Sequence, residues 1–273
     1  MSLCLHQNTS AGAGFRHSLA GWARAGIRNV ELSDTLLDEF LQSDSLVAAR
    51  SVITDLGLTP VSCAAVLPDF WLPGPGHALA VDTWKRRCEQ FSSLGIDRIY
   101  CPEITSRQVS DDDYRLALGC IRQAGDIAQQ FRMIAMLEFV RSSTFISTLP
   151  TALQLIRAAG HPNVLPLFDC YHFCAGLSKF EDLELLHSGE VGHVHFQDVP
   201  DGPREQLDNR TRSIPGEGVA PLVEVLRQLT AKGYSGALSV ELFQPEFTQA
   251  DPYELACRIR EKAEAVMGLA GVL

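Results

Sequence analysis

Short hydrophobic runs alternate with longer amphipathic stretches along the whole chain. Each run has the length of a β-strand, and most contain the β-branched residues that favour strands. The predicted strands are Leu3–His6, Val30–Leu32, Pro60–Val66, Arg98–Cys101, Met133–Phe139, Val164–Phe168, Val191–Phe196 and Ala237–Leu242. The amphipathic stretches predict helices at Ser18–Ala25, Ser45–Leu56, Ala80–Leu94, Asp111–Gln129, Thr151–Ala159, Lys179–Leu186, Val219–Lys232 and Pro252–Ala265. Gly26, Gly95 and Gly233 follow three of these helices, where a positive φ is needed to end a helix.

Eight successive strand-and-helix units predict an α/β protein built as a single closed (β/α)8 barrel, the TIM barrel. Strands of a parallel barrel are buried on both faces and are therefore nearly continuous in hydrophobic residues, as most of these runs are. The alternative is an open, doubly wound sheet, which usually carries a glycine-rich turn after its first strand. The segment after Leu3–His6 reads HQNTSAGAGF and lacks the GxGxxG pattern. We expect one barrel domain spanning residues 1–273, a length that suits this fold.

Composition and charge narrow the class of partner. Acidic residues outnumber basic ones by 33 to 23, which gives a net charge of −10, whereas a protein that binds nucleic acid needs a positive surface. No secretory signal follows Met1, and no apolar stretch is long enough to cross a bilayer, so we expect a cytoplasmic protein without a membrane partner. The eight cysteines are scattered and form no CxxC pair. We expect them to be reduced thiols, most of them buried.

Acids and a histidine stand near the ends of four consecutive predicted strands. The fifth run ends in MLEFV and places Glu138 there, and Asp169 follows the sixth run in PLFD. The seventh run lies in GHVHFQD and contains His195, and the eighth lies in LSVELF and places Glu241 near its end. The carboxyl ends of barrel strands form the rim at which active sites lie. Three carboxylates buried together there repel one another unless a cation compensates them. We expect these four residues to hold one divalent metal ion, Mn²⁺ or Zn²⁺ in the first place and Co²⁺ or Mg²⁺ as alternatives.

Several further polar residues lie near this rim. His193 faces the same side of its strand as His195 but lies deeper, so we expect it to be a packed residue. Asp198 follows shortly after and is expected to orient His195 from behind. Glu31 and Glu103 end or follow strands in the first half of the chain and have no identified partner.

Two residues are candidates for substrate contacts. His172 follows the sixth strand instead of lying in it, so it can lean over the pocket and donate to a substrate oxygen. Arg212 lies in a long polar loop after the seventh strand, and loops of this kind often close over barrel sites. A guanidinium there suits an anionic or hydroxyl-rich substrate.

The motifs LEFV, FDCYHF, HVHFQD, RSIPGEG and GYSGALSVELFQPEF resemble those of the xylose isomerase-like barrel family of sugar isomerases and epimerases. The resemblance runs from the first strand to the last helix and is strongest from about Met136 onward. Within the family it is greatest to the 2-keto-myo-inositol (inosose) isomerases. It implies metal ligation by the four strand-end residues, proton transfer by Glu138 and Glu241, and substrate contacts by His172 and Arg212.

These expectations combine into a metal-dependent isomerase or epimerase of a keto-sugar or keto-cyclitol, acting by proton abstraction through a cis-enediolate. The alternative is a dehydratase or lyase that uses the same site to expel a leaving group from a related keto-polyol or keto-glycoside. A DNA-repair endonuclease of this barrel family needs additional histidines after the third and fourth strands, where CAAVLPDF and CPEITS have none. A sugar-binding barrel without catalysis is the alternative from a different class. Association into a homo-oligomer stays open.

Overall fold

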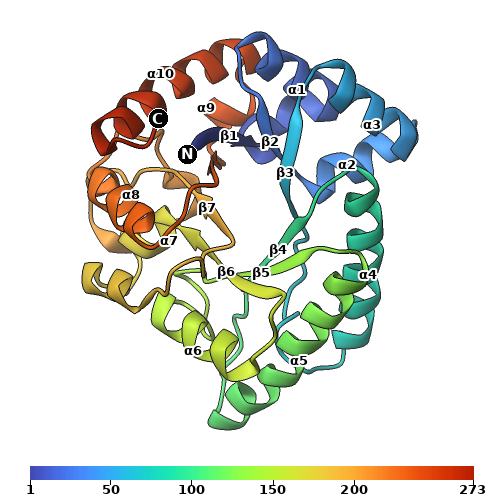
Figure 1. Ribbon diagram of the computed structural model, residues 1–273, viewed down its shortest axis with the longest axis vertical. Helices are drawn as coiled ribbons and strands as arrows, with labels where there is room; N and C mark the ends of the chain where they lie inside the picture. Colours follow the sequence, from blue (N-terminus) through green and yellow to red (C-terminus); the bar gives the residue numbers. More distant parts are fainter.

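The computed structural model describes residues 1–273 as a closed ring of parallel strands surrounded by helices (Figure 1). The strands are β1 (Ser2–His6), β2 (Asn29–Leu32), β3 (Thr59–Ala64), β4 (Arg98–Pro102), β5 (Ile134–Glu138), β6 (Val164–Asp169), β7 (His193–His195) and β8 (Ala237–Val240). Each strand pairs with its neighbours in sequence, and β1 also pairs with β8, which closes the ring. The predicted (β/α)8 barrel is confirmed, and the open sheet is excluded.

Helices cover the outside of the ring. The α-helices are α1 (Gly14–Arg24), α2 (Asp34–Leu41), α3 (Leu46–Asp55), α4 (His77–Ser93), α5 (Asp111–Gln130), α6 (Leu149–Ala159), α7 (Cys170–Ala175), α8 (Leu222–Ala231), α9 (Pro245–Thr248) and α10 (Pro252–Ala270). Short 3-10 helices occur at η1 (Gln7–Ala13), η2 (Phe180–Leu185), η3 (Arg204–Gln206) and η4 (Asn209–Thr211). The glycines predicted to end helices have positive φ angles of 85°, 89° and 81° at Gly26, Gly95 and Gly233.

One predicted helix is corrected. The stretch Lys179–Leu186 forms a 3-10 helix instead of an α-helix. Within the 3-10 helix Phe180–Leu185 only Leu183 is buried, while Phe180 and Leu185 are exposed. It therefore lacks the apolar face that sustains a longer surface α-helix.

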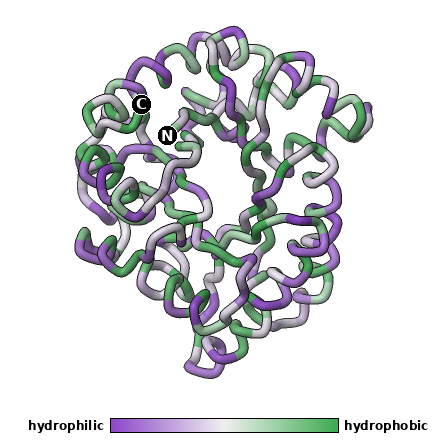
Figure 2. Tube along the Cα trace, viewed as in Figure 1, coloured by the Kyte–Doolittle hydropathy of each residue, from purple (hydrophilic) through white to green (hydrophobic).

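The main hydrophobic core lies between the ring and its helices. Outward-facing strand residues such as Leu5, Val30, Val194 and Leu238 pack there against buried helix residues. In Figure 2 the outer helices alternate between hydrophobic and hydrophilic colours along their length, as amphipathic helices do. The helices thus have one buried face each, and the strands keep their other face for the barrel interior.

The interior of the ring is partly polar. One side holds a separate apolar cluster of Ala64, Tyr100, Met136 and Leu167. Other strand positions of the interior carry buried polar side chains, among them His6, Glu31, Ser62, His193, His195 and Ser239. Polar groups in such a place need partners, because an unpaired buried polar group costs free energy. The interior is therefore where functional side chains are expected.

No helix of this structure combines the length and the apolar character that a bilayer crossing requires. All eight cysteines are free, and six of them are buried, as the scattered pattern predicts.

Candidate active site

Four strand ends bring the predicted ligand residues together. Glu138 and Asp169 are the last residues of β5 and β6, His195 is the last of β7, and Glu241 follows β8 directly. One nitrogen or oxygen atom from each of the four side chains lies within 4.8 Å of the others. All four side chains are buried. The predicted convergence at the carboxyl end of the barrel is therefore present in the structure.

His195 is at the centre of this cluster. Its Nδ1 atom lies 3.1 Å from Glu138 Oε1, 3.4 Å from Asp169 Oδ2 and 3.5 Å from Glu241 Oε2. One nitrogen can hydrogen-bond only one of three carboxylates well. Ligands that surround a metal ion at about 2.0–2.2 Å, in contrast, lie roughly 3 Å from one another. The spacing is therefore that of atoms able to share one cation.

Arg212 partly neutralises the cluster. Its Nη1 atom lies 2.6 Å from Glu241 Oε2 and 3.2 Å from Asp169 Oδ2. The guanidinium is buried and also lies over the rings of Tyr171 and Phe243. One guanidinium against three carboxylates leaves roughly two negative charges. A donor set of three carboxylates and one imidazole with this residual charge fits a divalent cation.

The carboxylates differ in their proton affinity. Burial raises the pKa of Glu138 to about 7, although the facing His195 ring partly offsets this effect. Burial also opposes ionisation of Asp169, but the Arg212 guanidinium outweighs it and holds the pKa of that carboxyl below its usual range. For His195, burial lowers the pKa, yet the surrounding carboxylates outweigh it and raise the pKa well above its usual value. Protons on Glu138 and His195 therefore balance part of the charge when no cation is bound.

Three residues from the first half of the ring support Glu241. Asn8 Nδ2 donates to Glu241 Oε1 at 3.2 Å, and the Tyr100 hydroxyl donates to the same oxygen at 3.3 Å. His6 Nε2 lies 3.1 Å from the Tyr100 hydroxyl and 3.7 Å from Glu241 Oε1. None of these three residues is among the site residues predicted from the sequence. The available signal was a lone polar residue in an apolar run, as in LCLH and RIYC.

His172 lies beside Arg212 instead of projecting freely into solvent. Its Nε2 atom is 2.9 Å from Arg212 Nη2 and accepts a hydrogen bond from it, while its backbone N–H donates to Asp169 Oδ1 at 2.6 Å. Burial lowers the pKa of His172 to about 3, so the ring is neutral near pH 7. The ring thus contacts the residue expected to bind substrate, and its own substrate contact stays a prediction.

A cavity of about 200 Å³ opens over the cluster. Glu138, Glu241 and Arg212 line its polar side, and apolar residues such as Ile104 and Val140 line the rest. Pockets for drug-sized ligands measure about 300–1,000 Å³. This cavity therefore suits a small molecule of mixed polar and apolar surface.

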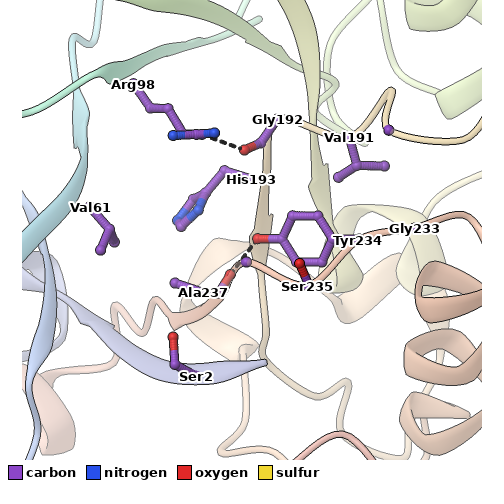
Figure 3. Close-up of a pocket in the computed structure, with 12 residues that line it drawn as sticks. Ser2, Val61, Arg98, Val191, Gly192, His193, Gly233, Tyr234, Ser235 and Ala237 are labelled. Atoms are coloured by element: carbon purple, nitrogen blue, oxygen red, sulfur yellow. Dashed lines mark hydrogen bonds between the residues drawn. The ribbon is translucent and has the colours of Figure 1, made fainter.

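A second cavity, of about 390 Å³, lies at the opposite end of the barrel, where the strands begin (Figure 3). Arg98 and Tyr234 in its lining are bonded to backbone carbonyls, those of Gly192 and Ala237. His193 also lines it and lies deeper than the rim, as expected. Residues at this end of a barrel usually stabilise the fold, whereas active sites lie at the carboxyl ends of the strands. The second cavity is therefore not the candidate active site.

Asp198 does not contact His195, so the prediction that it orients this ring is wrong. Its carboxylate instead accepts the backbone N–H groups of Gly216, Gly218 and Ala220 at 2.9–3.1 Å. It also accepts the N–H of Val199 at 2.8 Å. Asp198 lies three residues after His195, beyond the end of β7. Because successive side chains of an extended chain point to opposite sides, the Asp198 side chain points away from the barrel interior and into the following loop.

Comparisons with known proteins agree with this geometry. The family described as the xylose isomerase-like TIM barrel matches residues 20–264. The inosose isomerase of Bacillus velezensis is 25% identical over 272 residues, 98% of this chain and 97% of that protein. The inosose isomerase of Halalkalibacterium halodurans is 27% identical over 221 residues, 80% of this chain and 78% of that protein.

Two further similarities are relevant. The inosose dehydratase of Erwinia tasmaniensis is 28% identical over 174 residues, 59% of this chain and 57% of that protein. A crystal structure of the IolI protein with a bound zinc atom superposes with a TM-score of 0.91 at 23% identity, covering 98% of both chains.

Proposed function

The chain belongs to the xylose isomerase-like TIM barrel family, and on that premise we propose that it is a divalent-metal-dependent isomerase or epimerase of a keto-sugar or inosose-like keto-cyclitol. The observation that carries the proposal is the buried cluster of Glu138, Asp169, His195 and Glu241 at the rim, beneath a small cavity. The inosose isomerases among its relatives support the substrate class.

The four residues of the cluster would hold the ion, and Mn²⁺ or Zn²⁺ suits them best. Zinc is the metal bound in the IolI structure. Such an ion, when bound, polarises a substrate carbonyl with its neighbouring hydroxyl and stabilises the enediolate formed from them.

The two glutamates would move the proton. One carboxylate takes the proton from the carbon beside the carbonyl, and the C–H electron pair becomes part of a cis-enediolate. The other glutamate, in its protonated form, then gives a proton either to the adjacent carbon or to the opposite face of the first carbon. The first outcome shifts the carbonyl, with a proton passing between the two oxygens, and the second inverts the centre; exchange with solvent restores both glutamates.

Arg212 and His172 would bind and orient the substrate. Arg212 lines the cavity and is fixed by Glu241, Asp169 and His172, so its guanidinium is already oriented before a ligand arrives. A preorganised donor of this kind holds a hydroxyl-rich molecule with little loss of side-chain entropy.

Elimination is the second candidate function. A dehydratase starts with the same proton abstraction and then expels a β-hydroxyl group, and the inosose dehydratase of Erwinia tasmaniensis is a relative. Loss of water from the product distinguishes elimination from simple migration of the carbonyl.

The test is solvent exchange by the metal-loaded protein. Incubation with a panel of ketoses and inososes in D₂O should place deuterium on the carbon beside the carbonyl. Glu241→Gln should lower the exchange rate by about 10²–10⁴-fold, because a positioned base contributes that much, and it should also lower the metal content.

The control is Glu205→Gln, which changes an exposed glutamate of the loop after β7 and should leave both measurements unchanged. Full metal content with near-normal exchange in Glu241→Gln would contradict the proposed role. A wild-type protein that binds the ligands without any exchange would indicate a binding protein instead.

A further inference from the structure

Deeper in the barrel than the four-residue cluster, Glu31 of β2 lies between the two histidines of β7. Its Oε2 atom is 3.2 Å from His193 Nε2 and 3.3 Å from His195 Nε2. All three side chains are buried, and Glu31 has no exposed surface. The pairing of β2 with β3 shifts its register between Val30 and Glu31. Irregularities of this kind re-aim a side chain.

The two ring nitrogens of His195 therefore face different carboxylates. Nδ1 faces the three carboxylates of the cluster, and Nε2 faces Glu31. Nε2 is buried and forms no hydrogen bond in this structure, although Glu31 Oε2 lies 3.3 Å away. A neutral imidazole has one N–H and one lone pair. If the proton is on Nε2, the ring can donate a hydrogen bond to Glu31. The lone pair of Nδ1 then points toward the carboxylates of the cluster, where a metal ion would bind.

His193 fixes Glu31 from the other side. Its Nε2 atom forms a hydrogen bond with Glu31 Oε2. The His193 ring also lines the second cavity, at the end of the barrel where the strands begin, as Figure 3 shows. The carboxylate is thus fastened to the base of the barrel and presented to His195.

We propose that Glu31 is a positioning residue that sets the tautomer of His195 and so makes Nδ1 a metal ligand. The proposal rests on the metal site of the proposed function. Partners of this kind behind a ligand histidine raise its basicity and fix its ring, and losing one typically weakens metal binding about 10–100-fold.

The same three side chains could instead bind a second metal ion. Glu31, His193 and His195 can bring one ligand atom each within 4.8 Å of the others, so Glu31 would be a ligand itself if a second ion lay there. The two cases differ in stoichiometry. A positioning role requires one bound ion per chain, and a second site requires two.

The experiment is a competition titration of Zn²⁺ against a chelator, with wild type and Glu31→Gln. We expect one equivalent of Zn²⁺ in both proteins and about 10–100-fold weaker binding in the variant. Glu103→Gln is the matched control. Glu103 is also a buried glutamate at a strand end, but its carboxylate accepts from Thr105 N and Ile146 N. Its only bond to the cluster is from its backbone N–H to the Glu138 carbonyl, which the substitution keeps. Its variant should keep the wild-type affinity.

A second measurement needs no variant. With Zn²⁺ bound to histidine-labelled wild type, long-range ¹H–¹⁵N correlation should show His195 protonated at Nε2 and metallated at Nδ1. Metal on Nε2, two equivalents of Zn²⁺, or equal affinities in wild type and Glu31→Gln would each overturn the proposal. A wild-type protein that binds neither Zn²⁺ nor Mn²⁺ would remove the proposed function as well, so the two failures are distinguishable.

Discussion

Glu138 differs from the other two carboxylates of the cluster in how its charge is compensated. Asp169 and Glu241 each lie against the Arg212 guanidinium, whereas the hydrogen-bond partner of Glu138 is the His195 ring. Burial therefore raises its pKa to about 7. At neutral pH a fraction of the metal-free protein carries a proton on a side chain that must be ionised to bind a metal.

This pKa predicts that metal affinity falls as the pH falls through about 7. Below that value Glu138 is protonated in the metal-free protein, so binding must release its proton, and the raised pKa of His195 adds to the effect. One displaced proton corresponds to about a tenfold loss of affinity per pH unit. Zn²⁺ titrations in buffers between about pH 6 and pH 8, with proton release measured in parallel, check this. A dissociation constant independent of pH would contradict it.

At the residue scale, the sequence predicted the cluster well and its surroundings poorly. An acid or histidine at the end of an apolar run is visible in the sequence, which is why Asp169 and His195 could be placed. Glu31 could not be assigned, because its partners lie on a strand more than 160 residues away and become its neighbours only when the barrel closes. Asp198 was misassigned because nearness in sequence hid its direction away from the interior.

At the element scale, the Asp198 side chain makes the largest set of hydrogen bonds that hold the loop after β7. The Asp198 carboxylate accepts four backbone N–H groups, three of them from the far end of the loop. Arg141 adds contacts from the loop after β5, where it donates to the carbonyls of Ala175 and Arg204. The loop carries Arg212, so these contacts also determine where the guanidinium lies.

Asp198→Ala should therefore destabilise the protein by roughly 3 kcal/mol or more, because each buried donor left without its acceptor costs about 1–3 kcal/mol. Denaturant unfolding measures this, and limited proteolysis should show earlier cleavage between residues 199 and 218. Asp201→Ala in the same loop is the control, since Asp201 is exposed and should change stability by less than about 0.5 kcal/mol. Equal stability of the two variants would show that the carboxylate does not fasten the loop.

The periodicity of the chain predicted the long helices but not the short ones. Helices such as α5 span several turns, and their apolar faces are clear in the sequence. Segments such as α7 and η1 have 6 and 7 residues, too few for a period of 3.6 to be recognised. They form because the chain turns away from a strand end, and tertiary contacts hold them there.

At the scale of the whole molecule, the first and last helices meet where the ring closes (Figure 1). Gly21 of α1 faces the start of α10, and a Cβ atom at this position would lie 2.7 Å from Pro252 Cβ and 2.9 Å from Tyr253 N. The close approach of the two helices therefore depends on the absence of a side chain at Gly21.

Gly21→Ala should destabilise the protein by about 1–3 kcal/mol, the usual cost of overpacking, even though alanine favours helices. Gly119→Ala is the matched control, because Gly119 lies in α5 with no atom within 4 Å of the added methyl group. That variant should gain about 0.5–1 kcal/mol from helix propensity. Thermal or denaturant unfolding of both variants checks the opposite signs, and two changes of the same sign would refute the packing argument.

The barrel divides its tasks between two halves. The four side chains proposed to hold the ion come from the ends of β5 to β8, while Asn8, Val66 and Ile104 on the facing wall of the cavity come from loops after β1, β3 and β4. Those loops can be exchanged in chimeras with related barrels without replacing any of the four proposed ligands. If the proposed function holds, substrate selectivity can therefore change while the residues that carry the chemistry stay the same.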